Sequence, residues 1–395
     1  MLDVAAKITK AIPFDTHHLD RLLAEAGIDA LIVTSKHNIQ YLFGGYRFFF
    51  FDYMDAIGVS RYLPILVYRR GKPEDASYIG YRMESFENEL GRFWTPLVQT
   101  TTSTSVDAAR LAVEHIKRLG KGVHRIGVEV AFMPSDAAFI LQQELEGYEF
   151  VDAQFPLERL RARKTPKELT LLRESSEHVV GAMLETFKSC APGMTKNEIV
   201  ETLRRNEVNR GLTFEYCLIT AGTNQNRAPS DQRLKPGDIL SLDSGGNHHG
   251  YIGDLCRMGI LGEPDAELVD LLGFIDEVQQ TARKPIKAGA RGGEIFAVAE
   301  ALIHRSPHKS YVEFLAHGMG LVSHEAPRLT TRGPVPYGAY DADRPLEAGM
   351  VVSIETTMKH PERGFIKLED TVAVTDSGYE GFGDQGRGWN HAGKA

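Results

Sequence analysis

A ten-residue frame that occurs twice, and ends each time in an acidic residue, places the strongest constraint on how this chain can fold. The copies are residues 234–243 and 346–355, in which Leu, Gly, Ser and a carboxylate fall at the same offsets. Each copy contains an apolar, β-rich run and is followed by a second acid, Asp254 eleven residues after the first copy and Glu369 fourteen after the second. The repeat therefore predicts two related strand pairs that each carry two carboxylates.

The residues between the acids of each pair are typical of turns. Asp243 and Asp254 flank a segment rich in Gly and Asn, while Glu355 and Glu369 flank the turn-like segment 359–364. In a hairpin, the two acids of a pair can face the same side at cross-strand distance. A single acid beside a turn is more often a solvated hairpin end. These acids, however, follow apolar strand sequences, where a buried carboxylate is costly unless it is paired or metal-bound.

Between the two copies lie two histidines in a Gly-rich setting, His317 and His324. A lone His in an apolar stretch is more often a satisfied core residue than a ligand, and His324 could equally belong to a surface loop. Four carboxylates with an imidazole between them are nevertheless what two neighbouring divalent cations need. The ordered set predicts a site for two metal ions, and oxygen-rich ligation with one imidazole suits Mn, Co or Fe at least as well as Zn.

Composition restricts the classes of partner. The net charge of −8 argues against nucleic acid or an anionic membrane surface as a partner. No apolar run approaches the roughly 18 residues of a membrane span, and the first residues lack the basic start and apolar stretch of a signal peptide. Cys190, Cys217 and Cys256 are few, scattered and odd in number. We therefore expect reduced thiols in a cytoplasmic protein.

The first part of the chain alternates helix and strand signals. A helical pattern ends at Gly27, and the segment 106–119 has the period of an amphipathic helix. Strands are predicted at 30–34, 64–68, 76–79 and 125–129. This alternation favours a smaller α/β domain over residues 1–156, which ends at a charged boundary.

The second part of the chain pairs helices with the acidic strands. Thr165-Pro166 and the capping box 195–198 each open a helix ahead of the first acidic copy. Two further helices, at about 265–282 and 293–305, precede the second copy. Antiparallel strand pairs with helices between them predict an α+β domain over residues 157–395.

Taken together, these motifs resemble the pita-bread metallohydrolases, the family of methionine aminopeptidase, aminopeptidase P, prolidase and creatinase. Residues 22–45 are similar to the N-terminal domain of the prolidase and creatinase branch, and residues 161–168 resemble the entry to its catalytic domain. The resemblance implies a creatinase-type α/β domain, a pita-bread catalytic domain and a homodimer. The family's five metal-ligand positions are matched by Asp243, Asp254, His317, Glu355 and Glu369.

The resemblance also implies how these five residues would act. Asp243 would be bidentate to one metal, Asp254 and Glu369 would bridge both ions, and His317 and Glu355 would complete the coordination. A hydroxide between the metals would be the nucleophile, because metal binding lowers the pKa of water.

Two residues would take catalytic roles in the same scheme. Glu355 would carry a proton to the leaving nitrogen, and His324 would hydrogen-bond the substrate or the tetrahedral intermediate. The reaction implied is hydrolysis of a C–N bond, most conservatively by a dipeptidase or aminopeptidase specific for Xaa-Pro peptides. Creatinase itself lacks most of the ligand set, so it is disfavoured.

The positions that contact the peptide in that family differ here. Asn226 and Glu313 stand where the proline-specific peptidases usually have His, Lys367 stands where Arg is common, and Thr356 replaces a usual Pro. Arg and Lys are not equivalent where bidentate hydrogen bonding is needed. Ordinary drift and a changed substrate explain these departures equally well, and Asn226, Glu313 and Lys367 are predicted to bind substrate.

Two other segments stand out. The aromatic run 46–53 is most simply core or a buried interface, but by analogy with the family it could wall a substrate pocket in the partner subunit of a dimer. An extra stretch, 331–340, precedes the second acidic copy. Arg47, or Arg332 in that stretch, is predicted to anchor a substrate carboxylate.

Three hypotheses of function follow. The first is a dimetal hydrolase that cleaves Xaa-Pro peptides. The second is a metal-dependent hydrolase or lyase of a small metabolite on the same fold, consistent with the changed peptide-contacting positions. The third is a catalytically inactive binding module, against which the retention of all five ligand positions argues.

Overall fold

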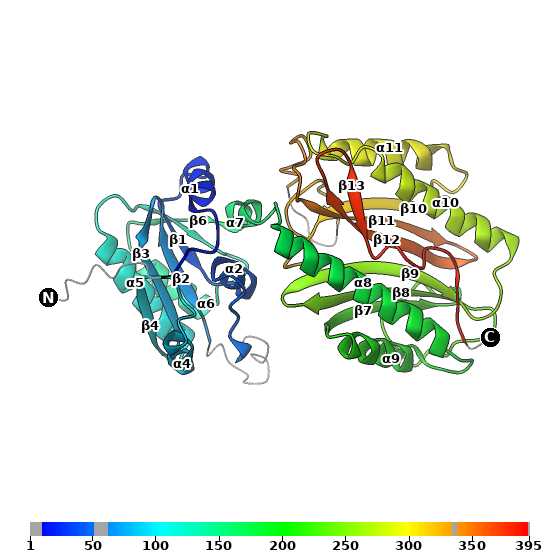
Figure 1. Ribbon diagram of the computed structural model, residues 1–395, viewed down its shortest axis with the longest axis horizontal. Coiled ribbons are helices and arrows are strands. Elements are labelled where there is room, and N and C mark those ends of the chain that lie inside the picture. The colour runs from blue at the N-terminus through cyan, green and yellow to red at the C-terminus, as the bar shows by residue number, and fades with distance from the viewer. Residues whose placement is uncertain (1–9, 51–61, 334–337, 394–395) are drawn as a thin grey trace. The chain divides into compact units, whose positions relative to one another are not determined.

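The computed structural model of the protein describes residues 10–50, 62–333 and 338–393 (Figure 1). The chain divides into two compact units, residues 1–161 and 162–395. The aromatic segment 46–53 is described only up to residue 50, and residues 334–337 of the extra stretch also lie outside the described ranges.

The first unit is built on one six-stranded mixed sheet. Its strands are β1 (Ala30–Val33), β2 (Ile65–Arg69), β3 (Lys72–Tyr81), β4 (Leu97–Thr102), β5 (Arg125–Val128) and β6 (Glu149–Asp152). Its helices are α1 (Thr16–Glu25), α2 (Lys36–Leu42), the 3-10 helix η2 (Arg82–Glu84), α4 (Ser85–Glu89), α5 (Ser105–Leu119), α6 (Ser135–Glu144) and α7 (Gln154–Leu160). The strand order is β4-β3-β2-β1-β5-β6, in which β2 pairs antiparallel with β1 and β3 while the other pairings are parallel.

Both faces of this sheet are buried, as the central strand β1 shows. Leu31 and Val33 join an apolar cluster with residues of α1, α2 and α7, whereas Ala30 and Ile32 join a second cluster with residues of α5 and α6. Alternate side chains of a strand point to opposite faces, so helices cover the sheet on both sides. The predicted α/β domain is confirmed. β4, α6 and β6 were not predicted, because β4 and β6 lack a buried apolar run and α6 has a weak amphipathic pattern.

The second unit contains one eight-stranded sheet. Its strands are β7 (Thr213–Ala221), β8 (Ile239–His248), β9 (Tyr251–Ile260), β10 (Val312–Gly318), β11 (Val351–His360), β12 (Gly364–Val374), β13 (Tyr379–Phe382) and β14 (Asn390–His391). Its helices are α8 (Pro166–Ser189), α9 (Lys196–Asn209), α10 (Ala266–Arg283) and α11 (Gly292–Arg305). The main strand order is β10-β11-β12-β9-β8-β7, with β13 paired to β12 and β14 to β9. The predicted order of an α/β domain followed by an α+β domain is the one observed.

The first two helices of this unit begin where their capping residues predict. At α8 the Thr165 side chain accepts a hydrogen bond from the Glu168 backbone N–H, and the Glu168 carboxylate accepts one from the Thr165 N–H. Thr195 and Glu198 form the same reciprocal pair at α9. These bonds satisfy amide donors that have no partner within the helix, which fixes the start of each helix.

The two acidic copies form two hairpins that meet in the middle of the sheet. The first hairpin is β8–β9 and the second is β11–β12, both antiparallel, and β9 pairs with β12 where Cys256 lies opposite Glu369. In Figure 1, α8 and α9 accompany β7, β8 and β9, while α10 and α11 accompany β10, β11 and β12. The predicted pair of related, acid-bearing strand pairs is therefore confirmed.

The helices pack on the face of the sheet opposite to the predicted site. Gly246 and Gly253, whose side-chain positions alternate with those of the hairpin acids, face α8. A Cβ atom at Gly253 would lie 2.8 Å from the Ser175 backbone, so glycine is required for this close packing. Gln279 of α10 likewise donates a hydrogen bond to Asp370, the neighbour of Glu369. Alternation in the strands therefore leaves the acids on the other face.

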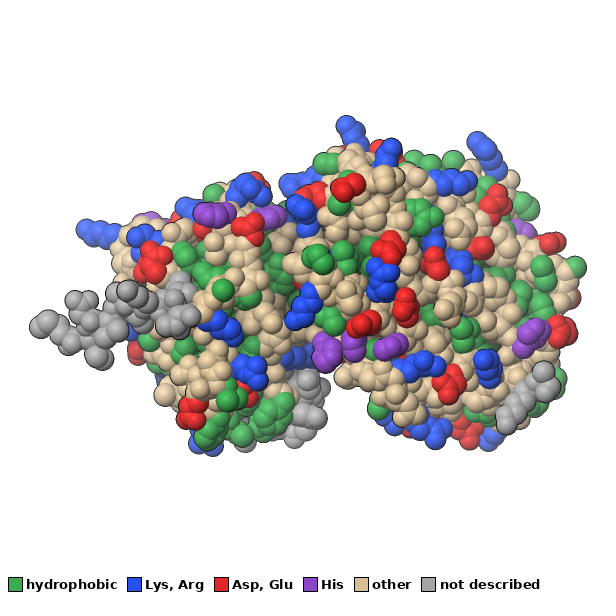
Figure 2. Space-filling model, in the orientation of Figure 1, with side chains coloured by type: hydrophobic (Ala, Val, Ile, Leu, Met, Phe, Trp, Pro, Cys, Tyr) green, Lys and Arg blue, Asp and Glu red, His purple; other side chains and the backbone are tan. Residues whose placement is uncertain are grey.

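On the face drawn in Figure 2, acidic, basic and hydrophobic side chains are interspersed. Among the helices of the described residues, none is both long and apolar enough to cross a membrane.

Candidate metal centre

Strand register brings the four predicted acids onto one face of the second sheet. Glu355 lies directly opposite Glu369, Glu369 lies opposite Cys256, and Cys256 lies opposite Asp243. Asp254 is two residues from Cys256 on the same strand, so it shares their face. All four carboxylates are buried or nearly so, with Asp243 and Glu369 2% exposed and Asp254 4% exposed.

The imidazole of His317 enters the same cluster from β10. His317 lies opposite Ser353, which shares a face with Glu355 two residues further along β11. Its Nε2 lies 3.6 Å from Glu369 Oε1 and 3.8 Å from Glu355 Oε1. Its Nδ1 lies 3.3 Å from the Gly318 carbonyl oxygen.

The His317 ring is suited to bind a cation. Its Nε2 atom is buried and has no hydrogen-bond partner among the described residues, although it points into a group of carboxylates. A neutral imidazole with the proton on Nδ1 presents a lone pair at Nε2, which is the usual way a histidine binds a metal ion. The residues present therefore fit the divalent cations that the resemblance implies.

The whole predicted ligand set is brought together. Three groups of side chains each offer one ligand atom per residue, all within 4.8 Å of one another. The groups are Asp254, His317 and His324; His317, Glu355 and Glu369; and Asp243, Asp254 and Glu369. Overlapping groups of oxygen and imidazole ligands could hold two adjacent divalent ions. Such ligands suit Mn, Co, Fe and Zn alike.

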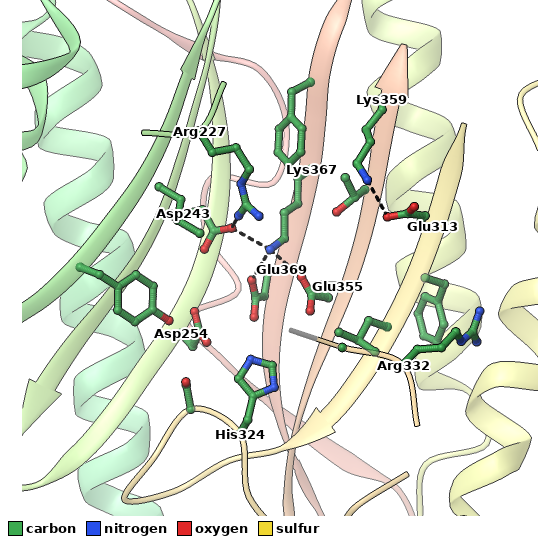
Figure 3. Close-up of a pocket in the computed structure, with 18 residues that line it drawn as sticks. Arg227, Asp243, Asp254, Glu313, His324, Arg332, Glu355, Lys359, Lys367 and Glu369 are labelled. Carbon is green, nitrogen blue, oxygen red and sulfur yellow. Dashed lines mark hydrogen bonds and ion pairs between the residues drawn. The ribbon is translucent and has the colours of Figure 1, made fainter. Parts of the chain in front are cut away.

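Two basic side chains also reach the cluster (Figure 3). Lys367 Nζ lies 2.7 Å from Asp243 Oδ2, 2.5 Å from Glu355 Oε2 and 2.8 Å from Glu369 Oε2. The Arg227 guanidinium forms an ion pair with the same oxygen of Asp243 and lies over the Phe365 ring. Arg227 was not predicted from the sequence, where its position next to Asn226 was the one available signal.

The charges of the cluster shift the pKa values of its members. Burial raises the pKa of Asp254, and the neighbouring Glu369 and Asp243 raise it further. Burial would also raise the pKa of Glu369, but Lys367 and His317 outweigh it and lower that pKa below the ordinary value. The four carboxyl groups thus share two basic side chains, Lys367 and Arg227, and a metal ion among them would favour the ionised form of all four.

His324 lies against His317, the histidine predicted to bind metal. Its ring stacks on that of His317 with centroids 3.8 Å apart and an interplanar angle of 22°. Burial, followed by the charge of His317, lowers the pKa of His324 to about 3. The neutral imidazole can donate or accept a hydrogen bond, as its predicted catalytic role requires.

A cavity of about 840 Å³ opens over the cluster. Besides the acids, its wall contains the apolar side chains of Leu218, Phe314, Leu315 and Phe365. Among the described residues, its other charged lining residues are Arg227, Glu313, Arg332, Lys359 and Lys367.

Two predicted substrate residues lie on the rim of this cavity. Glu313 is paired with Lys359 at 3.0 Å, and Arg332 is paired with Glu300 at 2.5 Å. Both members of each pair are at least one-third exposed, so these pairs can exchange partners with a ligand at modest cost.

Two other predicted substrate residues are placed elsewhere. Asn226 is exposed, does not line the described cavity wall, and uses its side-chain oxygen to accept a hydrogen bond from the Ala228 N–H. Arg47 belongs to the first unit. A role in substrate binding stays a prediction for Asn226 and Arg47, as it does for Glu313 and Lys367.

A buried carboxyl group supports the strand that carries Asp243. Glu207 of α9 is 0% exposed, and its Oε1 lies 2.8 Å from Ser244 Oγ on β8. Ser244 Oγ also lies 2.7 Å from the Tyr216 carbonyl oxygen, and the hydroxyl proton can be given to one acceptor at a time. Burial raises the pKa of Glu207 to about 8, so at neutral pH this carboxyl can donate its own proton to Ser244.

The free energy of unfolding should therefore depend on Glu207. Its pKa is about 4.3 in the unfolded chain. Since the folded-state pKa is higher, the contribution to stability is complete below pH 4.3 and is lost as the pH rises towards 8. Relative to Glu207→Gln, the wild type should lose about 1.4 kcal/mol per pH unit over this window.

Urea denaturation of both proteins at pH 5 and pH 7.5 measures this difference. Glu201→Gln, at an exposed position of the same helix, is the matched control and should leave the difference from wild type constant. A pH-independent gap between wild type and Glu207→Gln would show that the carboxyl is ionised in the folded protein.

Comparison with known proteins agrees with this geometry. Residues 170–376 match metallopeptidase family M24, and residues 16–163 match the creatinase/prolidase N-terminal domain. A Xaa-Pro dipeptidase from Lactobacillus delbrueckii subsp. lactis is 26% identical over 383 residues, covering 92% of this chain and 96% of that protein.

Solved structures share the fold over nearly the whole chain. A Xaa-Pro dipeptidase from Bacillus anthracis superposes with a TM-score of 0.79 at 22% identity, covering 95% of this chain and 98% of its own. A dipeptidase from Pyrococcus horikoshii gives a TM-score of 0.80 at 22% identity, with coverage of 95% and 99%. The family match spans more than half of the chain, and the chain belongs to metallopeptidase family M24, with an N-terminal domain of the creatinase/prolidase type.

Proposed function

We propose that this metallopeptidase hydrolyses the peptide bond of small Xaa-Pro substrates, with Asp243, Asp254, His317, Glu355 and Glu369 holding two divalent cations. The observation that carries the proposal is the convergence of these residues from five strands, with the Nε2 of His317 left without a hydrogen bond. A cation pair would supply Lewis acidity towards the scissile carbonyl and a bridging hydroxide as nucleophile.

The side chains around the cluster have defined tasks in this proposal. Glu355 lies at the cavity wall, where its carboxylate would pass a proton to the leaving nitrogen. The neutral His324 would donate a hydrogen bond to the carbonyl oxygen as negative charge develops there. Both groups are already positioned by the sheet and by the stacking of the two histidines, so little reorganisation is needed.

The cavity suits a small zwitterionic peptide. Its volume of about 840 Å³ lies within the range of small-molecule sites and exceeds what a dipeptide requires. Arg332 and Lys359 offer positive charge to a peptide carboxylate, and Glu313 offers negative charge to an amino terminus. Phe314, Leu315 and Phe365 supply apolar wall for a proline ring.

The test is a panel of Xaa-Pro dipeptides and tripeptides, with Xaa-Ala peptides as matched controls. We expect the Xaa-Pro peptides to be cleaved with added Mn²⁺ or Co²⁺, activity to vanish with a chelator, and activity to return when the metal is restored. Cleavage of neither series by the metal-loaded protein would contradict the proposal.

One observation favours the second candidate, a metal-dependent hydrolase or lyase of a small metabolite. Asn226 stands where the family resemblance implies a peptide-contacting His, and its side chain is bonded to its own loop instead of lining the cavity. If this departure altered specificity, Asn226→His should raise any residual cleavage of Xaa-Pro peptides. Turnover of a metabolite library by protein that cleaves no peptide would establish the second candidate.

We also propose a cytoplasmic location and a homodimeric state. Cys190, Cys217 and Cys256 are all buried and unpaired, which supports a reducing compartment. Light scattering of the purified protein tests the dimer, and fractionation of the source cells tests the location.

A further inference from the structure

Arg227 presents a guanidinium group to the cavity that uses few of its hydrogen-bond donors. Within the described ranges, its one hydrogen bond runs from Nη2 to Asp243 Oδ2. The Nε atom is buried and has no hydrogen-bond partner among the described residues. The side chain lines the cavity and is 34% exposed, with Cζ 5.0 Å from the centroid of the Phe365 ring (Figure 3). Because a buried donor without an acceptor is costly, this arrangement indicates an acceptor that the chain itself does not supply.

The loop that carries Arg227 is held in place from two sides. The Arg227 carbonyl oxygen accepts a hydrogen bond at 2.8 Å from the Ile219 N–H of β7. The carbonyl oxygen of the neighbouring Asn226 accepts one at 2.6 Å from Nζ of Lys196, a buried residue at the start of α9. A donor whose backbone is already fixed loses little freedom when it binds a ligand, which favours affinity.

The charge balance of the cavity also distinguishes Arg227. The two ion pairs at the rim are each neutral within themselves. If two divalent cations bind as proposed, their charge offsets that of the four clustered carboxylates, and Lys367 offsets a hydroxide between them. Among the described lining residues, Arg227 is then the charged group that lacks a counter-charge.

We propose that Arg227 binds a second carboxylate of the substrate, so that the preferred substrates are Xaa-Pro peptides whose first residue is Asp or Glu. This inference rests on the proposed function and names the substrate class of the same site. Lys359 and Arg332 already provide for the carboxylate at the end of the peptide. A guanidinium group has five N–H donors, so Arg227 can bind a second carboxylate while it keeps its bond to Asp243.

The surroundings of Arg227 suit an acidic side chain in two further ways. The Phe365 ring beside the guanidinium offers apolar wall to the methylene groups that precede the carboxylate. A Lys or Arg side chain in the same place would meet the positive charge of Arg227, and this repulsion disfavours basic peptides. The subsite should therefore select by charge and tolerate either length of acidic side chain.

The matched pair Glu-Pro and Gln-Pro tests the proposal, because the two peptides have the same shape and differ in one charge. With the Mn²⁺-loaded full-length protein, kcat/KM for Glu-Pro should exceed that for Gln-Pro at least about tenfold, the range expected for a charge-assisted hydrogen bond. Lys-Pro should be the poorest substrate of the three. A ratio near one for Glu-Pro over Gln-Pro in the wild type would overturn the second carboxylate site.

The decisive variant is Arg227→Gln, which should bring the ratio of Glu-Pro to Gln-Pro close to one. The ratio cancels any effect of the substitution on metal binding through Asp243, because both peptides use the same metal-loaded protein. Arg227→Lys retains the charge and should keep part of the preference. Arg233→Gln is the matched control. Arg233 is exposed in the same loop and does not line the described cavity wall, so its loss should leave the ratio unchanged.

Calorimetry with the same metal-loaded proteins gives a measurement that is independent of turnover. The probes are glutarate and its monoamide, which differ by one carboxylate. Glutarate should bind the wild type at least about tenfold more tightly than the monoamide, and Arg227→Gln should remove the difference. If Arg227→Gln does not accumulate as folded protein, the wild type and Arg227→Lys decide the question.

The outcomes separate this inference from the proposed function. Cleavage of Glu-Pro and Gln-Pro at equal rates would overturn the carboxylate site and leave the Xaa-Pro peptidase intact. A preference for Glu-Pro that survives in Arg227→Gln would also overturn it, since another group would then bind the carboxylate. If no peptide is cleaved, the proposed function is contradicted, and the glutarate titration alone decides whether Arg227 binds a carboxylate.

Discussion

Replacing Glu369 with glutamine is expected to abolish tight metal binding and to lower kcat/KM by on the order of a thousandfold, about 4 kcal/mol of transition-state stabilisation. Glu369 belongs to two of the three ligand groups, one with His317 and Glu355 and the other with Asp243 and Asp254. Ser353 Oγ, at 2.9 Å, already holds its Oε1 in place, so the amide can occupy the same position. The loss should therefore reflect the ligand chemistry and not a change of fold.

Metal content after dialysis, together with kinetics on an Xaa-Pro dipeptide, measures this effect. The matched control is Glu362→Gln, an exposed glutamate in the turn of the same hairpin, which should retain both metal and activity. Equal metal content in the wild type and in the Glu369→Gln variant would show that Glu369 does not bind the metal.

The second large effect is expected at Asp370, on the opposite face of the same strand. Asp370 is 0% exposed and pairs with Arg257 and Arg283 at 3.1 Å and with Arg387 at 2.5 Å. Burial alone would raise the pKa of Asp370, but the three arginines, Arg257 first among them, lower it below its ordinary value. The carboxylate is thus ionised at neutral pH and neutralises a buried group of guanidinium charges.

Asp370→Ala should lower the free energy of unfolding by about 3 to 5 kcal/mol, because it leaves buried charges without their partner. Urea denaturation at pH 7 gives the value. Asp384→Ala is the control within the same network. Asp384 also pairs with Arg283, at 2.6 Å, but its side chain is 42% exposed, and its loss should cost about 1 kcal/mol or less. Similar losses for the two variants would mean that Asp370 does not hold the network together.

The clustering of the four acids and His317 could be predicted because its signals are local. Asp243 and Glu355 each end an apolar run in a repeated frame, and two hairpin turns determine the positions of Asp254 and Glu369. Alternation in the strands then decides which face each acid occupies. The capping residues of α8 and α9 were equally clear, since a cap depends on residues three positions apart.

The surroundings of the ligands could not be predicted in the same way. Lys367, which is predicted to bind substrate, places its ammonium group among the carboxylates, beside Asp243, which lies 124 positions earlier in the chain. Arg227 reaches the same oxygen from a loop without any recognisable pattern. The side chain of Asn226, one residue earlier, accepts a hydrogen bond from the Ala228 N–H of its own loop. Neither periodicity nor spacing shows which basic side chains reach the acids, because that depends on which long side chains the cavity can accommodate.

The sequence by itself determined two acid-bearing hairpins, the helices that precede them and the set of residues predicted to bind metal, because each depends on residues close together in the chain. The tertiary structure alone decided that β9 pairs with β12, which joins the two hairpins into one cluster. It also decided that Lys367 and Arg227 share that cluster with the acids. The physical reason is that every side chain that reaches a buried centre contributes to its charge balance. The pairing of distant strands determines which side chains these are.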